Sequence, residues 1–585
     1  MKLSDYMVDF LVKKGITDFY GYQGTMIAHF IDSVYKNPRV ENHVCYNEQG
    51  ASFAACGYAT TKGACACAYA TSGPGAINLV SGIANAYYDS IPVVFITGQV
   101  NTYECHYEIK GLRQQVFQET DVVGIVKPIT KYAVRIDEPE MIRYELEKAY
   151  AIANSGRKGP VVIDLPMNIQ RAEINPDELK GYEGTEEQKQ DACTYQEADK
   201  KAVYEDLKAS FENAKTPVIV VGSGASPHTV EVLSSFAKAN KFPIVSSLLA
   251  KDRFEADDPN YFGYIGSAYG HRYANWIVAL KADLIITVGA SMCTRQTGTV
   301  LERFAPNAKL IRFDVDPSEL CRKVKEEENS YLLDCEQVAD LFELLQKQSD
   351  ITPCEDKWLS SCVEYKAYTE KFDASLEQRK PNQFMEALSE VTKPGDVVVG
   401  DVGQHMMWVG QSYLTKKNQK VLFSGGHGAM GFALPAAIGA STVRPKQRVY
   451  AVCGDGAFQM NIQELQWMKQ EQRNITAIVM NNQSLGLITQ QQDAYFDGNH
   501  FAAGSPYFSS PDFTKVAEAY GIESARVSTP EELKEVLLNH ITNTPFVVEV
   551  ILGEGTYAYP KTALGAPIYK QEPLMPEEEV KAFWK

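Results

Sequence analysis

Residues 449–482 alternate between strand-like and helix-like segments, and this alternation constrains the fold more than any other feature of the sequence. An apolar run at 449–453 leads into Gly-Asp-Gly at 454–456, and a stretch with apolar residues at three-residue steps follows. A second apolar run then ends in Asn481 and Asn482. This pattern predicts a strand, a tight turn, a helix, a strand and a polar turn, which is typical of a parallel sheet covered by helices.

Asp455 and Asn482 are candidate ligands of a divalent cation. In a parallel sheet, polar groups that follow neighbouring strands meet at the carboxyl edge, where such folds bind ligands. Hard oxygen ligands flanked by glycines suit a Mg²⁺ that clamps a diphosphate. A lone Gly-Asp-Gly or Asn-Asn is more often an ordinary turn, but the place of the two motifs in one strand–helix–strand unit favours the metal site.

A second polar segment lies near the other end of the chain, at 46–51, and leads into a run of small residues at 54–59. Its acid, Glu48, has two interpretations. It is either a solvated acid in the first turn of a helix, where the helix dipole favours a negative charge, or a functional acid that serves a cofactor. The residue types alone leave both interpretations open.

The composition limits the class of protein. A chain of 585 residues exceeds one ordinary core, and its net charge of −17 argues against a nucleic-acid partner, which requires clustered Lys and Arg. No apolar run reaches the roughly 18 residues of a membrane span, so no membrane partner is expected. Twelve cysteines are scattered without a disulfide framework or a zinc pattern, and we therefore expect a cytoplasmic location.

Strand-like and helix-like segments alternate throughout the chain, and two polar stretches divide it. Residues 183–200, rich in Glu and Gln, are predicted to be a linker, and a second polar stretch runs from 347 to about 380. The predicted domains are the segments 1–182, 200–347 and 380–585, the last with an extended tail.

Taken together, the sequence resembles the acetolactate synthase (acetohydroxyacid synthase) family of thiamine-diphosphate enzymes over nearly its whole length. The resemblance includes the segments around Glu48, Asp455 and Asn482. The other matching segments are 21–24, 71–76, 117–120, 159–166, 314–317, 402–405 and 424–431. It implies an α/β fold with parallel sheets flanked by helices, in which the three domains are pyrimidine-binding, central Rossmann-like and diphosphate-binding.

The resemblance also assigns roles to individual residues. Glu48 matches the glutamate that bonds the aminopyrimidine ring and activates the cofactor, and Gln118 and Phe117 match an active-site segment that faces the substrate. Met430 matches the large apolar residue that props the cofactor in a bent shape. The residues expected at the cofactor are Gln404, His405, Gly428, Met430, Gly454, Gly456 and Ala457. The residues expected at Mg²⁺ are Asp455, Asn482 and, through its backbone carbonyl, Ser484.

The function that this resemblance implies is a carboligase dependent on thiamine diphosphate and Mg²⁺. Such an enzyme decarboxylates pyruvate and joins the hydroxyethyl carbanion to a 2-oxo acid, which gives 2-acetolactate when the acceptor is pyruvate. The alternatives are acetyl transfer from pyruvate to a nucleotide-linked keto sugar and simple decarboxylation of a 2-oxo acid. Because the family usually builds its site from two subunits, a homodimer or homotetramer is expected.

Several positions depart from the family pattern. The family's flavin-binding glycine turn reads Leu-Ala-Lys-Asp at 249–252, and Ser291 replaces a flavin-contacting arginine, so FAD is doubtful. Gln491 takes the place of the acceptor-pocket tryptophan, which removes an apolar wall and adds hydrogen-bonding groups. Within the family, the segments 98–104, 113–115 and 490–496 and the extended C-terminal tail make the chain most similar to the group found in capsule and O-antigen sugar clusters.

Overall fold

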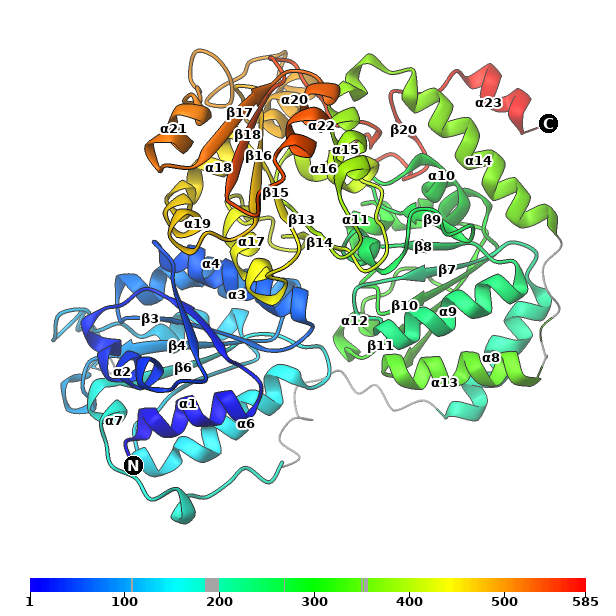
Figure 1. Cartoon of the computed structure of the whole chain (residues 1–585). Helices are drawn as coiled ribbons and strands as arrows, with labels where there is room; N and C mark the ends of the chain where they lie inside the picture. Colours follow the sequence, from blue (N-terminus) through cyan, green and yellow to red (C-terminus); the bar gives the residue numbers. More distant parts are fainter. Residues whose placement is uncertain (107–108, 185–198, 268, 349–350, 352–355, 585) are drawn as a thin grey trace. The chain divides into compact units, whose positions relative to one another are not determined.

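The structure, a computed structural model, describes residues 1–106, 109–184, 199–267, 269–348, 351 and 356–584 (Figure 1). Most of the predicted linker at 183–200 therefore lies outside the described residues. Within them the chain forms three parallel six-stranded sheets flanked by helices, together with one two-stranded ribbon, β19 (Lys561–Thr562) with β20 (Gln571–Glu572). The predicted α/β class is confirmed.

The first sheet has the strand order β2-β1-β3-β4-β6-β5. Its strands are β1 (Asp18–Gly21), β2 (Glu41–Val44), β3 (Ala66–Ala70), β4 (Val93–Gln99), β5 (Tyr132–Arg135) and β6 (Val161–Pro166). Its helices are α1 (Leu3–Lys13), α2 (Ala28–Lys36), α3 (Glu48–Lys62), α4 (Pro74–Tyr88), α5 (Val122–Val126), α6 (Ile142–Asn154) and α7 (Met167–Gln170). Successive side chains of a strand point to opposite faces. Ala68 of β3 accordingly packs into one core, whereas Cys67 and Tyr69 pack into another.

The central sheet has the order β12-β11-β10-β7-β8-β9, which is the order of the dinucleotide-binding folds. Its strands are β7 (Pro217–Val221), β8 (Ile244–Ser246), β9 (Tyr261–Tyr264), β10 (Leu284–Val288), β11 (Lys309–Asp314) and β12 (Glu328–Leu332). The helices that follow its strands or precede them are α8 (Lys200–Asn213), α9 (Pro227–Asn240), α10 (Arg272–Asn275), α11 (Thr294–Thr297), α12 (Pro317–Cys321), α13 (Cys335–Gln348) and α14 (Asp356–Ala374). Much of the polar stretch at 347–380 is thus the helix α14. It is anchored by the buried Trp358, whose indole N–H donates to the carbonyl of Pro217 at 3.0 Å.

The third sheet has the order β14-β13-β15-β16-β18-β17. Its strands are β13 (Val397–Gly400), β14 (Lys420–Phe423), β15 (Val449–Gly454), β16 (Ile475–Asn481), β17 (Glu523–Val527) and β18 (Phe546–Ile551). The helices of this part of the chain are α15 (Lys380–Val391), α16 (Gln404–Ser412), α17 (Ala433–Val443), α18 (Asp455–Met460), α19 (Leu465–Glu471), α20 (Gly486–Tyr495), α21 (Phe513–Ala519), α22 (Pro530–Asn539) and α23 (Glu577–Phe583). As predicted, β15 and β16 are parallel neighbours. The predicted tight turn at 454–456 is instead the start of a helix, because α18 begins at Asp455 itself.

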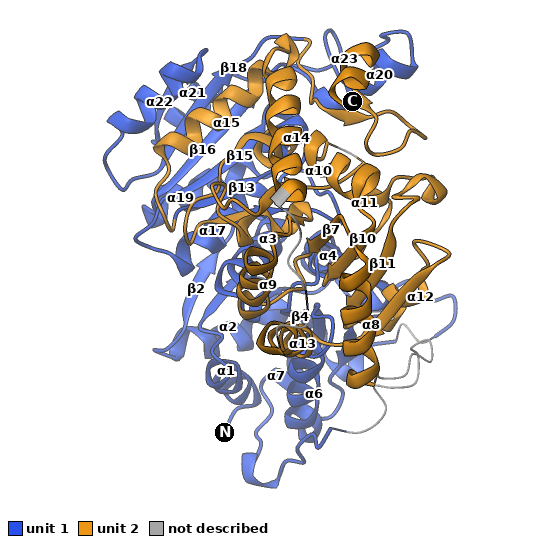
Figure 2. Ribbon diagram, turned by 90° about the vertical axis from the view of Figure 1, so that its right-hand side faces the viewer, with its two compact units in different colours: residues 1–186, 396–406, 422–554 blue, residues 187–395, 407–421, 555–585 orange. Residues whose placement is uncertain are grey.

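The chain divides into two compact units (Figure 2). Unit 1 comprises Met1–Glu186, Asp396–Met406 and Leu422–Glu554, and unit 2 comprises Glu187–Gly395, Met407–Val421 and Gly555–Lys585. The C-terminal tail is held within unit 2 by Arg272, which is 3% exposed and donates to the carbonyls of Gln571 and Pro573. The predicted domain boundaries stay a prediction. In the described part of the chain no helix has both the length and the apolar composition needed to cross a membrane.

Within unit 1, the helices α3 and α17 pack directly on each other and join the first sheet to the third. A Cβ atom on Gly57 of α3 would lie 2.1 Å from the carbonyl oxygen of Ala436. A Cβ atom on Gly439 of α17 would lie 1.9 Å from the carbonyl oxygen of Ala54. Both distances are far below van der Waals contact, so the close approach of the two helices requires glycine at both positions.

Candidate active site

Asp455 lies at the carboxyl edge of the third sheet, directly after β15, and is only 1% exposed. One carboxylate oxygen, Oδ2, accepts from Ser510 Oγ at 2.5 Å, and the other accepts from the Gly456 amide at 3.0 Å. Burial raises the pKa of Asp455 to about 6. A buried carboxylate of this kind is stabilised in its charged form by a nearby cation.

Asn482 follows the neighbouring strand β16 and is linked to Gln404, the first residue of α16. Its Nδ2 donates to Gln404 Oε1 at 3.2 Å, and its Oδ1 accepts from the Ser484 amide at 3.3 Å. Gln404 Nε2 in turn donates to the carbonyl of Gly486 at 2.9 Å and to Gln490 Oε1 at 3.3 Å. The ends of β15 and β16 therefore lie side by side, as predicted, and Gln404 is bonded to Asn482 at the end of β16.

His405 lies beside the Gly-Asp-Gly segment and is 4% exposed. Its Nε2 accepts from the Gly454 amide at 3.1 Å, so the ring is neutral with its proton on Nδ1. Burial agrees with this state, since it lowers the pKa of His405 to about 3. A Cβ atom on Gly454 would lie 2.8 Å from the ring, which explains why glycine stands there.

The segment before α17 brings Met430 to the same edge of the sheet. A Cβ atom on Gly456 would lie 3.6 Å from Met430 Cε, so the thioether lies next to the start of α18. Asp401, which follows β13, holds this segment by accepting from the amides of Gly431 and Ala433, both at 2.9 Å. Burial raises the pKa of Asp401 to about 6, and its backbone partners favour the charged form.

The remaining predicted cofactor residues differ in their surroundings. Ala457 is buried in the first turn of α18, whereas Gly428, with φ of +71°, is exposed, and a Cβ atom there would meet nothing within 4 Å. The donors that converge at this edge are a carboxylate, a carboxamide and backbone groups flanked by glycine. Such a donor set fits Mg²⁺ and a diphosphate, because Mg²⁺ prefers oxygen ligands and glycine lets phosphate oxygens reach backbone amides.

Glu48 is the first residue of α3 and is 8% exposed, so it is not a solvated acid. Its Oε2 accepts from Asn78 Nδ2 at 3.0 Å. Asn47 caps the helix by accepting from the Gln49 amide at 2.8 Å. A Cβ atom on Gly75 would lie 3.0 Å from Glu48 Oε1, so this oxygen faces the loop that follows β3. A buried carboxylate oriented in this way can accept a further hydrogen bond from a group bound beside the loop.

Gln118 lies against the same loop. It adopts a left-handed conformation with φ of +66°, and a Cβ atom on Gly73 would lie 3.1 Å from its own Cβ. Its neighbour Phe117 is 75% exposed. Among the described residues, no hydrogen bond or ion pair joins Glu48 or Gln118 to Asp455. The structure therefore brings the predicted residues together in two groups, one at the first sheet and one at the third.

The sequence interpretation missed Glu464, which is fully buried just before α19. Its Oε1 accepts from the Tyr46 amide at 3.0 Å and lies 2.5 Å from the place of a Cβ atom on Gly50. The other oxygen, Oε2, has no partner among the described residues, and burial raises the pKa of Glu464 to about 8. In the sequence Glu464 is an ordinary charged residue between the apolar Ile462 and Leu465, so no local signal marks it.

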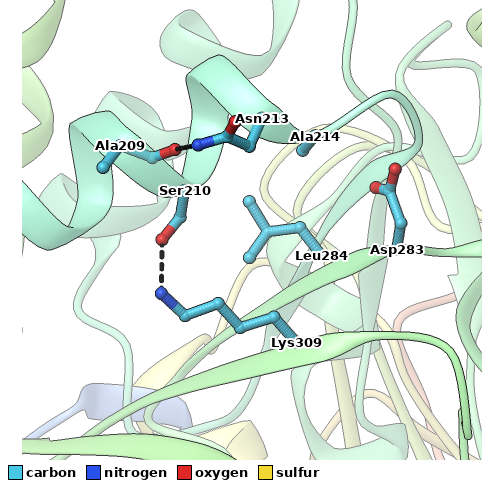
Figure 3. A pocket seen from close by; sticks show the side chains of 7 residues that line it. All are labelled: Ala209, Ser210, Asn213, Ala214, Asp283, Leu284 and Lys309. Atoms are coloured by element: carbon cyan, nitrogen blue, oxygen red, sulfur yellow. Dashed lines mark hydrogen bonds between the residues drawn. The ribbon is translucent and has the colours of Figure 1, made fainter.

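A separate hollow of about 230 Å³ in unit 2 does not bring polar groups together for chemistry (Figure 3). Lys309 Nζ donates to Ser210 Oγ at 2.8 Å and to Asp206 at 2.6 Å, and Asn213 Nδ2 donates to the carbonyl of Ala209 at 2.7 Å. These polar side chains bond one another and the backbone. The groups at the first and third sheets therefore stay the stronger candidates.

Three family models match the chain. Residues 1–125 match the N-terminal TPP binding domain of the thiamine pyrophosphate enzymes, residues 205–340 match their central domain, and residues 401–550 match their C-terminal TPP binding domain. The first and last of these contain the two groups of residues described above.

Curated relatives match along almost their entire length. The acetolactate synthase isozyme 3 large subunit of Escherichia coli is 33% identical over 571 residues, which are 96% of each chain. The acetolactate synthase large subunit of Haemophilus influenzae is 33% identical over 589 residues, covering 98% of this chain and 99% of the relative. A probable acetolactate synthase large subunit of Methanocaldococcus jannaschii is 33% identical, covering 94% and 92%.

Proposed function

Because this chain belongs to the acetolactate synthase family of thiamine-diphosphate enzymes, we propose that it is a carboligase that decarboxylates pyruvate and joins the remaining two-carbon unit to a second 2-oxo acid. With pyruvate as the acceptor, two pyruvates and a proton give 2-acetolactate and CO₂. The observation that carries this proposal is the convergence of Asp455, Asn482 and Gln404 at the carboxyl edge of the third sheet.

Asp455, Asn482 and the Ser484 carbonyl would hold Mg²⁺, and Gln404 and His405 would contact the diphosphate. When bound, thiamine diphosphate supplies the stabilised carbanion on which this chemistry depends. The other work belongs to side chains of the protein. The Glu48 carboxylate holds and moves a proton at the aminopyrimidine ring. The Gln118 amide can donate to a substrate carbonyl, and Phe117 adds apolar surface beside it.

We also expect the site to require more than one copy of the chain. Among the described residues no hydrogen bond or ion pair joins Glu48 to Asp455, and the family usually completes its site between subunits. We expect a homodimer or a homotetramer, which light scattering of the purified protein would distinguish. A monomer with full activity would contradict this part of the proposal.

The direct test is to incubate the purified protein with pyruvate, thiamine diphosphate and Mg²⁺, and to resolve the products. We expect 2-acetolactate and CO₂, and loss of turnover when a chelator removes Mg²⁺. Free aldehyde as the main product would indicate a simple decarboxylase instead. Turnover only after addition of a nucleotide-linked keto sugar would indicate that alternative acceptor.

Gln491 provides a test of the acceptor preference. Its side chain is exposed on α20, next to Gln490, which contacts Gln404. An apolar contact of the missing size is worth roughly 1–3 kcal/mol of discrimination, so the wild-type protein is expected to select poorly between 2-oxobutyrate and pyruvate. Gln491→Trp should raise the preference for 2-oxobutyrate in direct competition. Gln492→Trp, which faces another direction on the same helix, should not.

FAD is expected to bind weakly or not at all. The amides of Gly222 and Gly224, which follow β7, donate to the carbonyls of Val288 and Gly289 at 2.9 and 3.1 Å and are not free for a dinucleotide. Lys251, in the 3₁₀ helix Leu248–Arg253, is 5% exposed at the place of the family's flavin turn, and burial lowers its pKa to about 8. Purified protein should be colourless although it binds thiamine diphosphate. A yellow preparation with equimolar FAD would contradict this expectation.

A further inference from the structure

Asp164 is a buried carboxylate that belongs to neither group of site residues. It lies in β6 and is 1% exposed. Its Oδ1 accepts from Thr97 Oγ1 at 2.7 Å, and its Oδ2 accepts from Gln99 Nε2 at 3.1 Å. Both partners come from β4, the strand that pairs with β6 in parallel. Burial of a carboxylate is unfavourable unless hydrogen bonds stabilise it, and Thr97 and Gln99 supply those bonds here.

The side chain of Gln99 connects Asp164 to the backbone of the segment that carries Gln118. Gln99 is fully buried, and its Nε2 also donates to the carbonyl of Thr120 at 2.7 Å. Its Oε1 accepts from the Val100 amide at 3.0 Å. Both protons of the amide nitrogen and its oxygen are therefore used, so the amide group has one orientation only.

The segment of Gln118 needs this support, because a left-handed conformation is unfavourable for a residue other than glycine. On the other side of the segment, the Glu119 carboxylate accepts from the amides of His106, Gln115 and Val116 at 2.5, 2.8 and 3.3 Å. Asp164 and Glu119 thus hold the segment from two directions. Beyond it lies the loop of Gly73 and Gly75, which also contacts Glu48.

We propose that Asp164 is a positioning residue that acts through Gln99 and Thr120 to hold Gln118 in its left-handed conformation beside the Glu48 loop. The inference rests on the proposed function for the role of Gln118, but the link from Asp164 to Thr120 is a property of the structure alone. The charged carboxylate accepts from both Thr97 and Gln99, and a hydrogen bond to a charged acceptor is roughly twice as strong as one to a neutral acceptor. A protonated Asp164 would therefore hold Gln99, and through it Thr120, more weakly.

The surroundings of Asp164 bring the pH at which its carboxyl gains a proton close to neutral. Burial raises the pKa of Asp164 to about 7, while the hydrogen bonds from Thr97 and Gln99 oppose the increase. The charged and titratable groups that face it are Arg135 of β5, which pairs with Asp137, the Asp121 carboxylate, and the Cys105 thiol. Below this pH the carboxyl is protonated and the bridge is weakened, so turnover should fall as the pH is lowered through about 7.

Three variants of the full-length holoenzyme test the proposal. Gln99→Met removes the bridge, and Asp164→Asn replaces its charged acceptor with a neutral amide. A small displacement of an active-site group can cost about 100-fold in turnover. We expect losses of that order, with the Kd for thiamine diphosphate little changed. In Asp164→Asn the acid limb of the pH profile should disappear. Thr97→Val removes the other hydrogen bond of Asp164, which opposes the rise in its pKa. This variant should move the acid limb to higher pH and leave the turnover on the alkaline plateau nearly unchanged.

Amide hydrogen exchange gives a readout that does not depend on the reaction. Exchange in residues 115–121 should be faster in Asp164→Asn and Gln99→Met than in the wild type or in Thr97→Val. Equal losses in all three variants, or unchanged exchange in the first two, would show that Asp164 only stabilises the core. If Asp164→Asn does not fold, Gln99→Met, which conserves volume, decides the matter. If the wild-type protein does not turn over pyruvate, the proposed function is wrong. The hydrogen-exchange comparison would still decide whether Asp164 holds the segment of Gln118.

Discussion

Replacement of Glu48 by Gln is expected to lower the turnover of pyruvate by about 100- to 10,000-fold, the usual contribution of a positioned acid or base. The amide has the same shape, and its oxygen can still accept from Asn78, as Glu48 Oε2 does now. The fold and the Kd for thiamine diphosphate should therefore change little. What is lost is the ability of the side chain to hold and release a proton. Turnover and calorimetric titration with the cofactor, measured on one preparation, separate the two effects.

Glu140→Gln is the matched control, because this exposed carboxylate lies in the 3₁₀ helix Pro139–Met141, far along the chain from the site residues. It should behave like the wild type in both measurements. Wild-type turnover in Glu48→Gln would show that Glu48 is only a buried residue at the start of α3. A loss of cofactor binding equal to the loss of turnover would assign it to binding instead.

Replacement of Asp455 by Ala is expected to weaken Mg²⁺-dependent binding of thiamine diphosphate by at least about 100-fold. Loss of a residue that only supports a metal ligand typically costs 10- to 100-fold in metal affinity, and a ligand itself should cost more. Because Asp455 is buried without a cationic partner of its own in the described chain, its removal should not lower the melting temperature severely. Calorimetry with thiamine diphosphate at fixed Mg²⁺ measures the effect.

Two further variants make this test specific. Ser510→Ala removes the hydroxyl that donates to Asp455 and should weaken binding by roughly 10-fold. Glu535→Ala removes an exposed carboxylate from α22 and should have no effect. Cofactor bound at wild-type affinity by Asp455→Ala would exclude this residue as a metal ligand, whatever the other variants do.

The sequence predicted the third sheet and its metal-ligand candidates because strand ends follow from hydrophobic periodicity. Once 449–453 and 475–480 are identified as neighbouring strands, the side chains of Asp455 and Asn482 must lie at one edge. The periodicity did not predict that a helix begins at Asp455. Gly and Asp favour turns locally, and only the packing of α18 against the sheet, with Phe458 in the core, overrides that preference.

Other parts of the site could not be predicted, because they depend on contacts between distant segments. Ser510 reaches Asp455 from a loop without periodicity, and Asp401 acts through backbone amides that carry no residue-specific signal. Glu464 has an ordinary place in its own segment and acquires its surroundings only when Tyr46 and Gly50 approach it. The resemblance to a family named residues that contact a cofactor, whereas these three residues contact other parts of the protein.

The close packing of α3 on α17 has a consequence for the symmetry of unit 1. Each helix connects the second strand of its sheet to the third, and both sheets have the order second-first-third-fourth-sixth-fifth. Gly57 meets Ala436 as Gly439 meets Ala54, which is the reciprocal pattern of an isologous interface around a twofold axis. The two halves of unit 1 thus meet as the subunits of a symmetrical dimer do, with one polypeptide supplying both. A larger residue at either glycine would separate the same pair of helices.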